Sequence, residues 1–332
     1  MPLHRWLWLA VCGALIGCLD PSEPGALVPK TVMEDPALPR IEVNGTVLHA
    51  VTFGEPGNPL VMVLHGGPGG SDFRSLLPLS ALADDGFFVV FWDQRGAGLS
   101  QRHDSDVYTF DRVLEDLRQV IDHYTSNDAQ PLVFIGHSWG AMYATWFINE
   151  YGTYGGRVRG AVLSEPGAFT KAQLDSYMQR LFGSYDFLGE QLNDVSLLGQ
   201  FMTPADHARA DYLMAIQSAG GAPAMHLDPS KPEPHERLGA VAQQALFALA
   251  DREGFDWTTH LGSFAPTVLF LRGSLNEVAN LEHQQELASS YPHHEMVTMD
   301  GVGHEMVWER PVEYLEHVRT YFERIGFSGE AR

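Results

Sequence analysis

The sequence is most informative at Leu132-Val133-Phe134-Ile135-Gly136-His137-Ser138-Trp139-Gly140-Ala141. The four apolar residues at its start indicate a buried strand, and a helix is expected to begin at Ala141. Between them, Gly-x-Ser-x-Gly is the pattern of a nucleophile elbow, a sharp strand-to-helix turn that lifts the serine hydroxyl clear of the backbone. Glycines are needed at 136 and 140 because side chains there would collide with the neighbouring strand and helix. The sequence therefore predicts Ser138 as a nucleophile.

Short apolar runs alternate with amphipathic segments along most of the chain. The runs are rich in β-branched and aromatic residues, and we expect strands at Val47–Phe53, Leu60–Leu64, Phe87–Trp92, Leu132–Ile135, Val158–Ser164, Val268–Leu271 and Met296–Met299. Helices are expected at Asp111–His123, Ala141–Glu150 and Leu281–Ser290. This alternation is typical of a mostly parallel, doubly wound α/β sheet that is covered by helices on both faces.

The segment from residue 168 to residue 261 breaks this alternation. Helical patterns follow one another there at Leu174–Leu181, Ala205–Ser218 and Leu238–Ala250, with a Pro-rich joint at Asp228–Pro234. We expect an inserted helical cap over the carboxyl edge of the sheet, which is the edge where ligands bind in open α/β folds. The core then comprises residues 40–167 and 262–328.

A second glycine-rich stretch, His65-Gly66-Gly67-Pro68-Gly69-Gly70, follows the expected strand at Leu60–Leu64. Glycines allow backbone N–H groups to approach a substrate oxygen closely, as an oxyanion hole requires. We expect its donors to be the N–H groups of Gly67 and Trp139. A phosphate-binding loop is the alternative, but the chain lacks both a following Lys-Ser or Lys-Thr and the spacing of a dinucleotide fingerprint.

The base that activates the serine is expected late in the chain, because elbow enzymes order their triad as serine, acid and histidine. Asp300-Gly301-Val302-Gly303-His304 follows the last apolar run, and its flexible glycines suit a loop that brings a histidine over the serine. His304 is therefore the expected base. Most other histidines, such as His207 and His283, have polar neighbours in the sequence and are expected to be solvated.

Together with Trp92-Asp93-Gln94-Arg95-Gly96-Ala97-Gly98-Leu99-Ser100, these motifs make the chain resemble the proline iminopeptidase family of α/β hydrolases. The similarity covers about residues 40–165 and resumes over 266–322, without extending to the expected cap. It implies the α/β-hydrolase fold and action on short peptides. In that family the Asp-Gln-Arg-Gly segment closes a loop behind the active site, so the resemblance implies structural roles for Asp93 and Arg95.

Two glutamates compete for the role of the acid. The family pattern has an aspartate after the seventh strand, where this chain has Asn276, and an amide cannot stabilise an imidazolium as a carboxylate does. Glu165 ends the expected strand Val158–Ser164, on the edge of the sheet that carries Ser138, and is our first candidate. Several haloalkane dehalogenases, relatives in fold, resemble this arrangement. Glu277 is the alternative, although an extended chain would turn its side chain the other way.

The first 39 residues differ in composition from the rest. His4 and Arg5 precede an apolar run too short to span a bilayer, and Leu15-Ile16-Gly17-Cys18 resembles the lipobox of bacterial lipoproteins. We expect a signal peptide at residues 1–17, a lipid on Cys18 and a Pro-rich tether at residues 18–39. The protein would then be lipid-anchored in the bacterial cell envelope, its body outside the cytoplasm and its membrane contact through the lipid only. An incidental Cys18 is the alternative.

The amino-acid composition limits the partners and cofactors that the protein is expected to have. With 42 acidic against 21 basic residues, the net charge of −21 would repel phosphate backbones and excludes nucleic acid as the partner. Both cysteines lie in the first twenty residues, so the body has neither a disulfide nor a thiolate metal site. No metal and no cofactor are expected.

These features predict a serine hydrolase that forms an acyl-enzyme on a small peptide or ester. The family resemblance favours an aminopeptidase or iminopeptidase-like enzyme on short peptides, whereas the unmatched cap favours a carboxylesterase or lipase-like enzyme. A binding protein that kept the fold is a third alternative, motivated by Asn276. Dehalogenase or epoxide hydrolase chemistry would need a carboxylate in place of Ser138. The oligomeric state is left open.

Overall fold

The structure, a computed structural model, describes residues 28–183, 207–218 and 223–329. One sheet has the strand order β1-β2-β4-β3-β5-β6-β7-β8. Its strands are β1 (Arg40–Val43), β2 (Thr46–Phe53), β3 (Leu60–Leu64), β4 (Phe88–Trp92), β5 (Leu132–His137), β6 (Val158–Ser164), β7 (Val268–Gly273) and β8 (His294–Met299). β2 pairs antiparallel with β1 and β4, and every other pair is parallel. The predicted mostly parallel sheet is confirmed.

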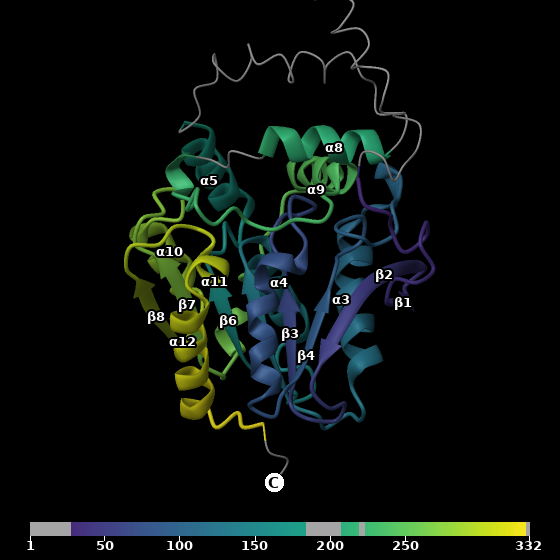
Figure 1. Cartoon of the computed structure of the whole chain (residues 1–332). Coiled ribbons are helices and arrows are strands. Elements are labelled where there is room, and N and C mark those ends of the chain that lie inside the picture. Colours follow the sequence, from purple (N-terminus) through teal and green to yellow (C-terminus); the bar gives the residue numbers. More distant parts are fainter. Residues whose placement is uncertain (1–27, 184–206, 219–222, 330–332) are drawn as a thin grey trace, which may run out of the picture.

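From β3 onward, helices lie in the connections between the strands (Figure 1). The longer ones are α3 (Phe110–Tyr124), α4 (Trp139–Tyr151), α5 (Lys171–Gly183), α8 (His207–Ser218), α9 (Ala240–Glu253), α10 (Leu281–Ala288) and α12 (Pro311–Arg324). The short helix α11 (Met306–Glu309) and the 3-10 helices η2 (Phe73–Ala83), η3 (Ser105–Val107), η4 (Pro223–Met225) and η5 (Leu261–Ser263) complete the set among the described residues.

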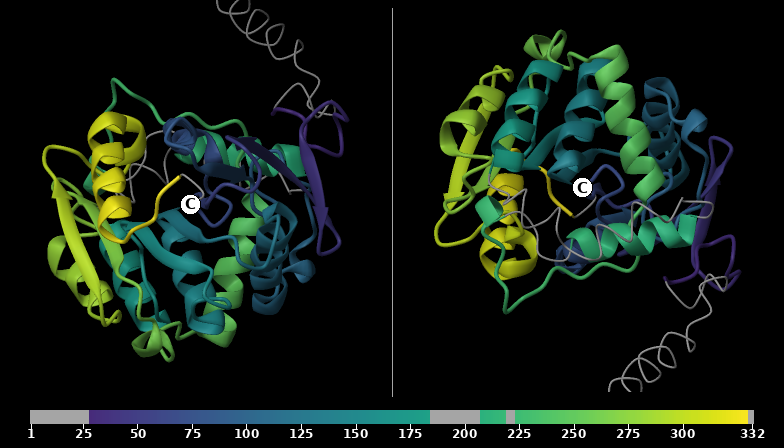
Figure 2. Two further views of the ribbon diagram at one scale, coloured as in Figure 1. Left: turned by 90° about the horizontal axis from the view of Figure 1, so that it is seen from below. Right: turned by 90° about the horizontal axis from the view of Figure 1, so that it is seen from above.

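Alternate residues of the central strands pack on opposite faces of the sheet. In β3, Leu60, Met62 and Leu64 belong to the apolar layer that holds α3 and α4. Val61 and Val63 belong to the layer that holds η2 and α12. Every residue of β3 is buried, because the sheet is covered on both sides, and this explains the unbroken apolar runs in the sequence. Figure 2 shows the two layers of helices from above and below.

The inserted helices α5, α8 and α9 come between β6 and β7 in the chain and lie beyond one end of the strands in Figure 1. Met214 of α8 packs on Leu238 and Ala240 at the start of α9. The N–H of Gly239 donates to Gly69 O at 2.7 Å, so the insertion contacts the glycine-rich loop after β3. Parts of the expected cap, residues 184–206 and 219–222, lie outside the described residues.

The N-terminal predictions fall partly outside the structure. The expected signal peptide and Cys18 lie outside the described residues, as do all residues before 28. Residues 28–39, expected as part of the tether, instead pack on the body: Val32 is fully buried and donates its N–H to Leu99 O at 2.8 Å. Arg237 of the insertion donates to Pro29 O at 2.8 Å. Within the described part of the chain, no helix has the length and apolar character needed to cross a membrane.

Candidate active site

Ser138 lies at the turn between β5 and α4. Its φ of 53° and ψ of −118° belong to a region that a non-glycine residue rarely adopts, and its N–H donates to Ser164 O at 2.8 Å. A Cβ at Gly136 would overlap the backbone of Gly140, and a Cβ at Gly140 would overlap Leu64 O. The two glycines therefore let α4 pack directly on the strands, which holds the turn. Ser138 is half-buried, while the residues on either side of it are buried.

The carboxylate of Glu165 lies against the imidazole of His304. Glu165 follows β6 with a φ of 46°, and its side chain is completely buried. Its Oε2 is 2.7 Å from Nδ1 of His304, and its Oε1 accepts the N–H of Gly273 at 2.7 Å. Because a carboxylate only accepts hydrogen bonds, Nδ1 of His304 is the donor. Nε2 is then left with the lone pair that a general base needs.

Asn276 completes the surroundings of this carboxylate. Its Oδ1 accepts the N–H groups of Val278 and Ala279 at 3.0 and 3.1 Å, which leaves Nδ2 to donate to Oε2 of Glu165 at 2.6 Å. Nδ2 also lies 3.2 Å from Nδ1 of His304. Since both nitrogens are donors when each faces Glu165, this approach is a contact without a hydrogen bond. Asn276 therefore holds the Glu165 carboxylate in place beside His304.

Glu277, the alternative acid, is directed elsewhere. Its side chain is 72% exposed, and its Oε1 lies 3.2 Å from Nε2 of His226 at the surface. A side chain one residue after Asn276 points away from the buried pair because Asn276 itself turns inward. Of the two carboxylates considered from the sequence, the structure brings only Glu165 to His304.

His137 connects the elbow to the histidine loop. Its Nε2 donates to His304 O at 2.9 Å, and the two imidazole rings lie 4.5 Å apart. Burial, with the neighbouring His304, lowers the pKa of His137 to about 3, so this imidazole is neutral. Within the described residues, no hydrogen bond joins Oγ of Ser138 to His304. Such bonds are often formed only in the substrate complex.

The glycine-rich loop lies against the elbow, and Gln94 ties the two together. A Cβ at Gly66 would be 3.4 Å from Cβ of Ser138, so the loop passes directly beside the serine. Gln94 donates from its backbone to Nε2 of His65 and from its side chain to His65 O, at 3.0 and 2.9 Å. Its Oε1 accepts from Nε1 of Trp139 at 2.8 Å. Gln94 thus fixes the spacing between the two segments that carry the expected oxyanion donors, Gly67 and Trp139.

Asp93 and Arg95, on either side of Gln94, have structural partners. Asp93 Oδ2 lies 2.8 Å from His49 Nδ1 and accepts the N–H of Leu99 at 2.8 Å. Arg95 forms a buried two-pronged contact with Asp116, at 2.7 and 2.6 Å. These contacts hold the loop after β4 against β2 and α3.

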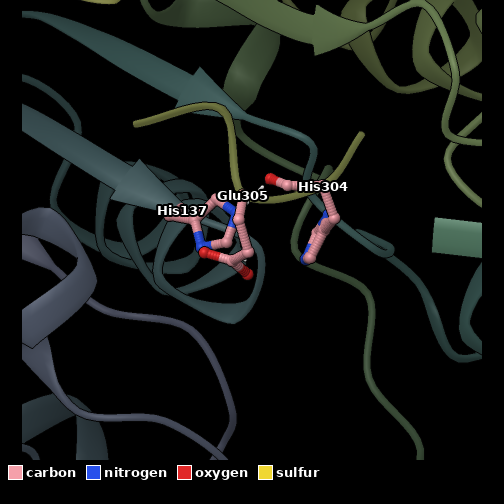
Figure 3. Close-up of side chains that lie close together, drawn as sticks. All are labelled: His137, His304 and Glu305. Carbon is pink, nitrogen blue, oxygen red and sulfur yellow. Dashed lines mark hydrogen bonds and ion pairs between the residues drawn. The ribbon is translucent and has the colours of Figure 1, made fainter. Parts of the chain in front are cut away.

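Two carboxyl groups that the sequence analysis missed lie beside the histidines. Glu305 is buried, and its Oε1 is 4.0 Å from Nε2 of His137 (Figure 3). Burial, with the neighbouring Glu233 and Glu309, raises the pKa of Glu305 well above its usual value. Glu233 belongs to the insertion. Against the effect of burial, its hydrogen bond to His235, 3.0 Å from its Oε2, lowers the pKa of Glu233.

Only Glu305 left a signal in the sequence, namely its position directly after His304. Glu233 left none, because a Pro-rich segment without periodicity does not show which side chain faces the sheet. The expectation that His283 is solvated was also wrong. Its side chain is buried, and its Nε2 lies 2.7 Å from Gly167 O. Polar neighbours along the chain do not show where a helix turns one of its side chains.

Comparisons with known proteins agree with this architecture. The family model for the alpha/beta hydrolase fold matches residues 59–311. A proline iminopeptidase of Saccharolobus solfataricus is 26% identical over 287 residues, which cover 81% of this chain and 86% of that protein. Epoxide hydrolase A of Mycobacterium tuberculosis is 28% identical over 315 residues, with coverage of 82% and 93%.

Two solved structures share the fold. An esterase from Thermogutta terrifontis has a TM-score of 0.61 at 20% identity, covering 86% of this chain and 99% of that one. A proline iminopeptidase-related protein from Thermus thermophilus has a TM-score of 0.60 at 21% identity, with coverage of 87% and 97%.

Proposed function

Because the chain belongs to the α/β-hydrolase fold family, as its sequence predicted, we propose that it is a serine hydrolase with Ser138 as nucleophile, His304 as base and Glu165 as acid. The observation that carries the proposal is the buried contact of 2.7 Å between Oε2 of Glu165 and Nδ1 of His304. A carboxylate in this position keeps the imidazole in the tautomer with Nε2 free, and stabilises the imidazolium that forms during the reaction.

The reaction proceeds through an acyl-enzyme. Oγ of Ser138 attacks the substrate carbonyl carbon while Nε2 of His304 takes the hydroxyl proton. The imidazolium then gives this proton to the leaving amine or alcohol, and the bond to the leaving group breaks. Water attacks the acyl-enzyme in the same way, with His304 again as base, and frees the acid and Ser138. The proton is carried by His304 in each step and is not passed on to Glu165.

Asn276 fits this mechanism as a positioning residue. Its amide, in the place of the family's aspartate, is the reason for the alternative of a binding protein without catalytic activity. The hydrogen bond from its Nδ2 to Glu165 gives it a role that an amide can fill, and Glu165 supplies the missing negative charge. These contacts support an enzyme over a binding protein.

The oxyanion that forms on the substrate is held by the N–H groups of Gly67 and Trp139. Trp139 is the first residue of α4, so its N–H has no acceptor within the helix. The glycine-rich loop lies beside Ser138, which supports Gly67 as the second donor. One such donor is typically worth about 10²–10³ in rate.

For the substrate, we favour short peptides with a free amino group. The proline iminopeptidases among the relatives support this choice, and so do the two carboxyl groups near His304. Glu233, with its lowered pKa, is negatively charged and largely buried, and a protonated amine is bound inside a protein only with such a partner. An esterase has no need of a buried charge there. The similarity to epoxide hydrolases does not extend to the nucleophile, because Ser138 stands where they would need a carboxylate.

A panel of aminoacyl-arylamides against short and long p-nitrophenyl esters tests the proposal, with wild type and Ser138→Ala. We expect turnover of the arylamides that Ser138→Ala abolishes. Activity on the esters alone would replace the aminopeptidase by an esterase. Activity on neither series, or activity that the substitution leaves unchanged, would favour the binding protein.

We also propose that Cys18 carries a lipid that anchors the protein in the bacterial cell envelope, with the body outside the cytoplasm. The described part of the chain begins at residue 28, so the length of the segment from 18 to 27 limits the reach of the anchor. Fully extended, they span at most about 35 Å. The body would therefore work close to the membrane surface.

A further inference from the structure

His137, His304 and Glu305 form a compact group of metal-ligand side chains. All three are buried, and one ligand atom from each lies within 4.8 Å of the others. His137 ends β5, whereas His304 and Glu305 lie in the loop between β8 and α11, so the sheet edge brings two separate segments together. In Figure 3 the Glu305 carboxylate extends towards the imidazole rings.

Two imidazoles and one carboxylate are a donor set that suits Zn²⁺. Imidazole ligands favour Zn²⁺, Cu²⁺ and Ni²⁺ over Mg²⁺ and Ca²⁺, which prefer oxygen ligands. A second carboxyl group, that of Glu233, is hydrogen-bonded to Glu305 and adds negative charge beside the group. The chemistry of these residues therefore points to a transition-metal ion rather than an alkaline-earth ion.

The orientation of His304 suits a metal ligand as well as a base. Its Nδ1 donates to Glu165 at 2.7 Å, which leaves the lone pair of Nε2 available. In metal sites the ligating histidine donates its other ring N–H to a carboxylate in this way, which fixes the ring and raises the basicity of the ligand nitrogen. The Glu165–His304 pair therefore has the geometry of a metal ligand with its supporting carboxylate.

We propose that His137, His304 and Glu305 bind a divalent transition-metal ion, with Zn²⁺ preferred, and that the bound ion inhibits the hydrolase. The ion occupies Nε2 of His304, the atom that has to accept the proton of Ser138, so nucleophile activation and metal binding exclude one another. The inhibition rests on the proposed function, whereas the binding of the metal does not.

Binding requires small movements. Zinc with nitrogen and oxygen ligands at its usual bond lengths holds them about 3.4 Å apart. Nε2 of His137 and Oε1 of Glu305 are 4.0 Å apart, and all three ligand atoms lie within 4.8 Å of one another, so no pair has to close by more than about 1.4 Å. If His137 binds through Nε2, it gives up its hydrogen bond to His304 O. That loss weakens the site relative to a structural zinc site and makes its binding reversible.

The experiment measures metal binding and nucleophile reactivity separately on the full chain. Calorimetric titration with Zn²⁺ gives the Kd, and the rate of fluorophosphonate labelling of Ser138 gives the state of the nucleophile. We expect one ion per chain, a labelling rate that falls in parallel with occupancy, and full recovery with EDTA. Mg²⁺ and Ca²⁺ at the same concentrations are expected to leave labelling unchanged.

Variants locate the site. Glu305→Gln and His137→Gln are each expected to raise the Kd for Zn²⁺ at least tenfold. The matched control is His226→Gln, which removes an exposed histidine that pairs with Glu277 and is expected to keep the wild-type Kd. Zinc affinity that neither buried variant changes would overturn the site, and so would a loss of affinity in His226→Gln alone.

Two further measurements distinguish a failure of the metal site from a failure of the proposed hydrolase function. The visible spectrum of Co²⁺ in the wild type reports tetrahedral coordination without any substitution, and its absence at saturation would also overturn the site. Ser138→Ala is expected to bind Zn²⁺ as the wild type does. If the wild type is never labelled, the proposed function fails, while the titration of Ser138→Ala still decides the metal site. Labelling that saturating Zn²⁺ leaves unchanged would overturn the inhibition.

Discussion

Replacing Glu165 with Gln tests the proposed acid directly, because the substitution keeps the size of the side chain and removes its charge. Three donors converge on this carboxylate: the N–H of Gly273 on Oε1, and Asn276 Nδ2 and His304 Nδ1 on Oε2. A glutamine has one oxygen and one NH₂ group. If the glutamine oxygen faces His304, its NH₂ group faces the N–H of Gly273. In the reverse orientation the NH₂ group faces Nδ2 of Asn276 and Nδ1 of His304. Each orientation leaves a buried donor facing another donor.

The expected effect has two separable parts. A buried donor without an acceptor lowers the free energy of unfolding by about 1–3 kcal/mol. The loss of the charge that stabilises the imidazolium acts on turnover. In a serine protease the comparable change of carboxylate to amide lowers turnover by about 10⁴, which corresponds to roughly 5.4 kcal/mol in the activation barrier. Thermal unfolding measures the first part, and kcat measures the second.

The assay compares kcat and the rate of fluorophosphonate labelling in the wild type, Glu165→Gln and Glu277→Gln. Glu277→Gln is the matched control, since it makes the same chemical change at a carboxylate that is 72% exposed. We expect it to stay within a few-fold of the wild type. Near-normal turnover in Glu165→Gln, together with a loss of several orders of magnitude in Glu277→Gln, would refute the reasoning and place the acid after β7.

His304→Ala is expected to abolish fluorophosphonate labelling of Ser138, because the serine is weakly nucleophilic without its base; labelling that survives would remove His304 from the mechanism. Gln94→Leu removes the acceptor of Trp139 Nε1 and a donor to His65 O. Because the oxyanion donors are then misplaced, kcat is expected to fall by about tenfold to a hundredfold. An unchanged kcat would show that the glycine-rich loop keeps its position without Gln94. Glu305→Gln is expected to raise the Tm above pH 5 and to leave it unchanged at pH 4. The raised pKa of Glu305 means that the folded chain keeps a proton which the unfolded chain releases above its ordinary pKa of 4.5, so stability falls as the pH rises from there. Identical profiles of Tm against pH in the variant and the wild type would contradict this. Finally, the mature protein is expected to begin at a lipid-modified Cys18 and to partition with membranes, and mass spectrometry that finds this cysteine unmodified in the native host would rule out the anchor.

The central strands and the elbow were predictable because their signals are local. The side chains of β3 are buried on both faces, which leaves an unbroken apolar run whose short length and β-branched residues are typical of a strand in a covered sheet. Gly136 and Gly140 stand where neighbouring backbone leaves no room for a Cβ. The glycines are recognised because Gly-x-Ser-x-Gly is one contiguous pattern, although the atoms that exclude a Cβ at Gly140 belong to Leu64 and His65 of another segment.

The edges of the fold were less predictable. The short strand β1 was missed, because four residues carry too little periodicity to be distinguished from a loop. The Pro-rich composition of residues 18–39 predicted a free tether, yet Val32 is buried and Arg237 binds Pro29 O. Composition describes how a segment behaves alone, whereas single apolar side chains and carbonyl groups can still dock on a surface that is formed elsewhere in the chain.

The sequence by itself placed Ser138 in an elbow, His304 in a late glycine-rich loop, and a carboxylate at one of two positions. Only the tertiary structure decided which carboxylate contacts His304, because Glu165 is 139 residues away along the chain and meets it where the ends of β6 and β7 and the loop after β8 converge. The same convergence brings Glu305 and His137 together and turns Asn276 towards Glu165. Local patterns fix which residues begin and end an element, but contacts between loops depend on how the strands are ordered across the sheet.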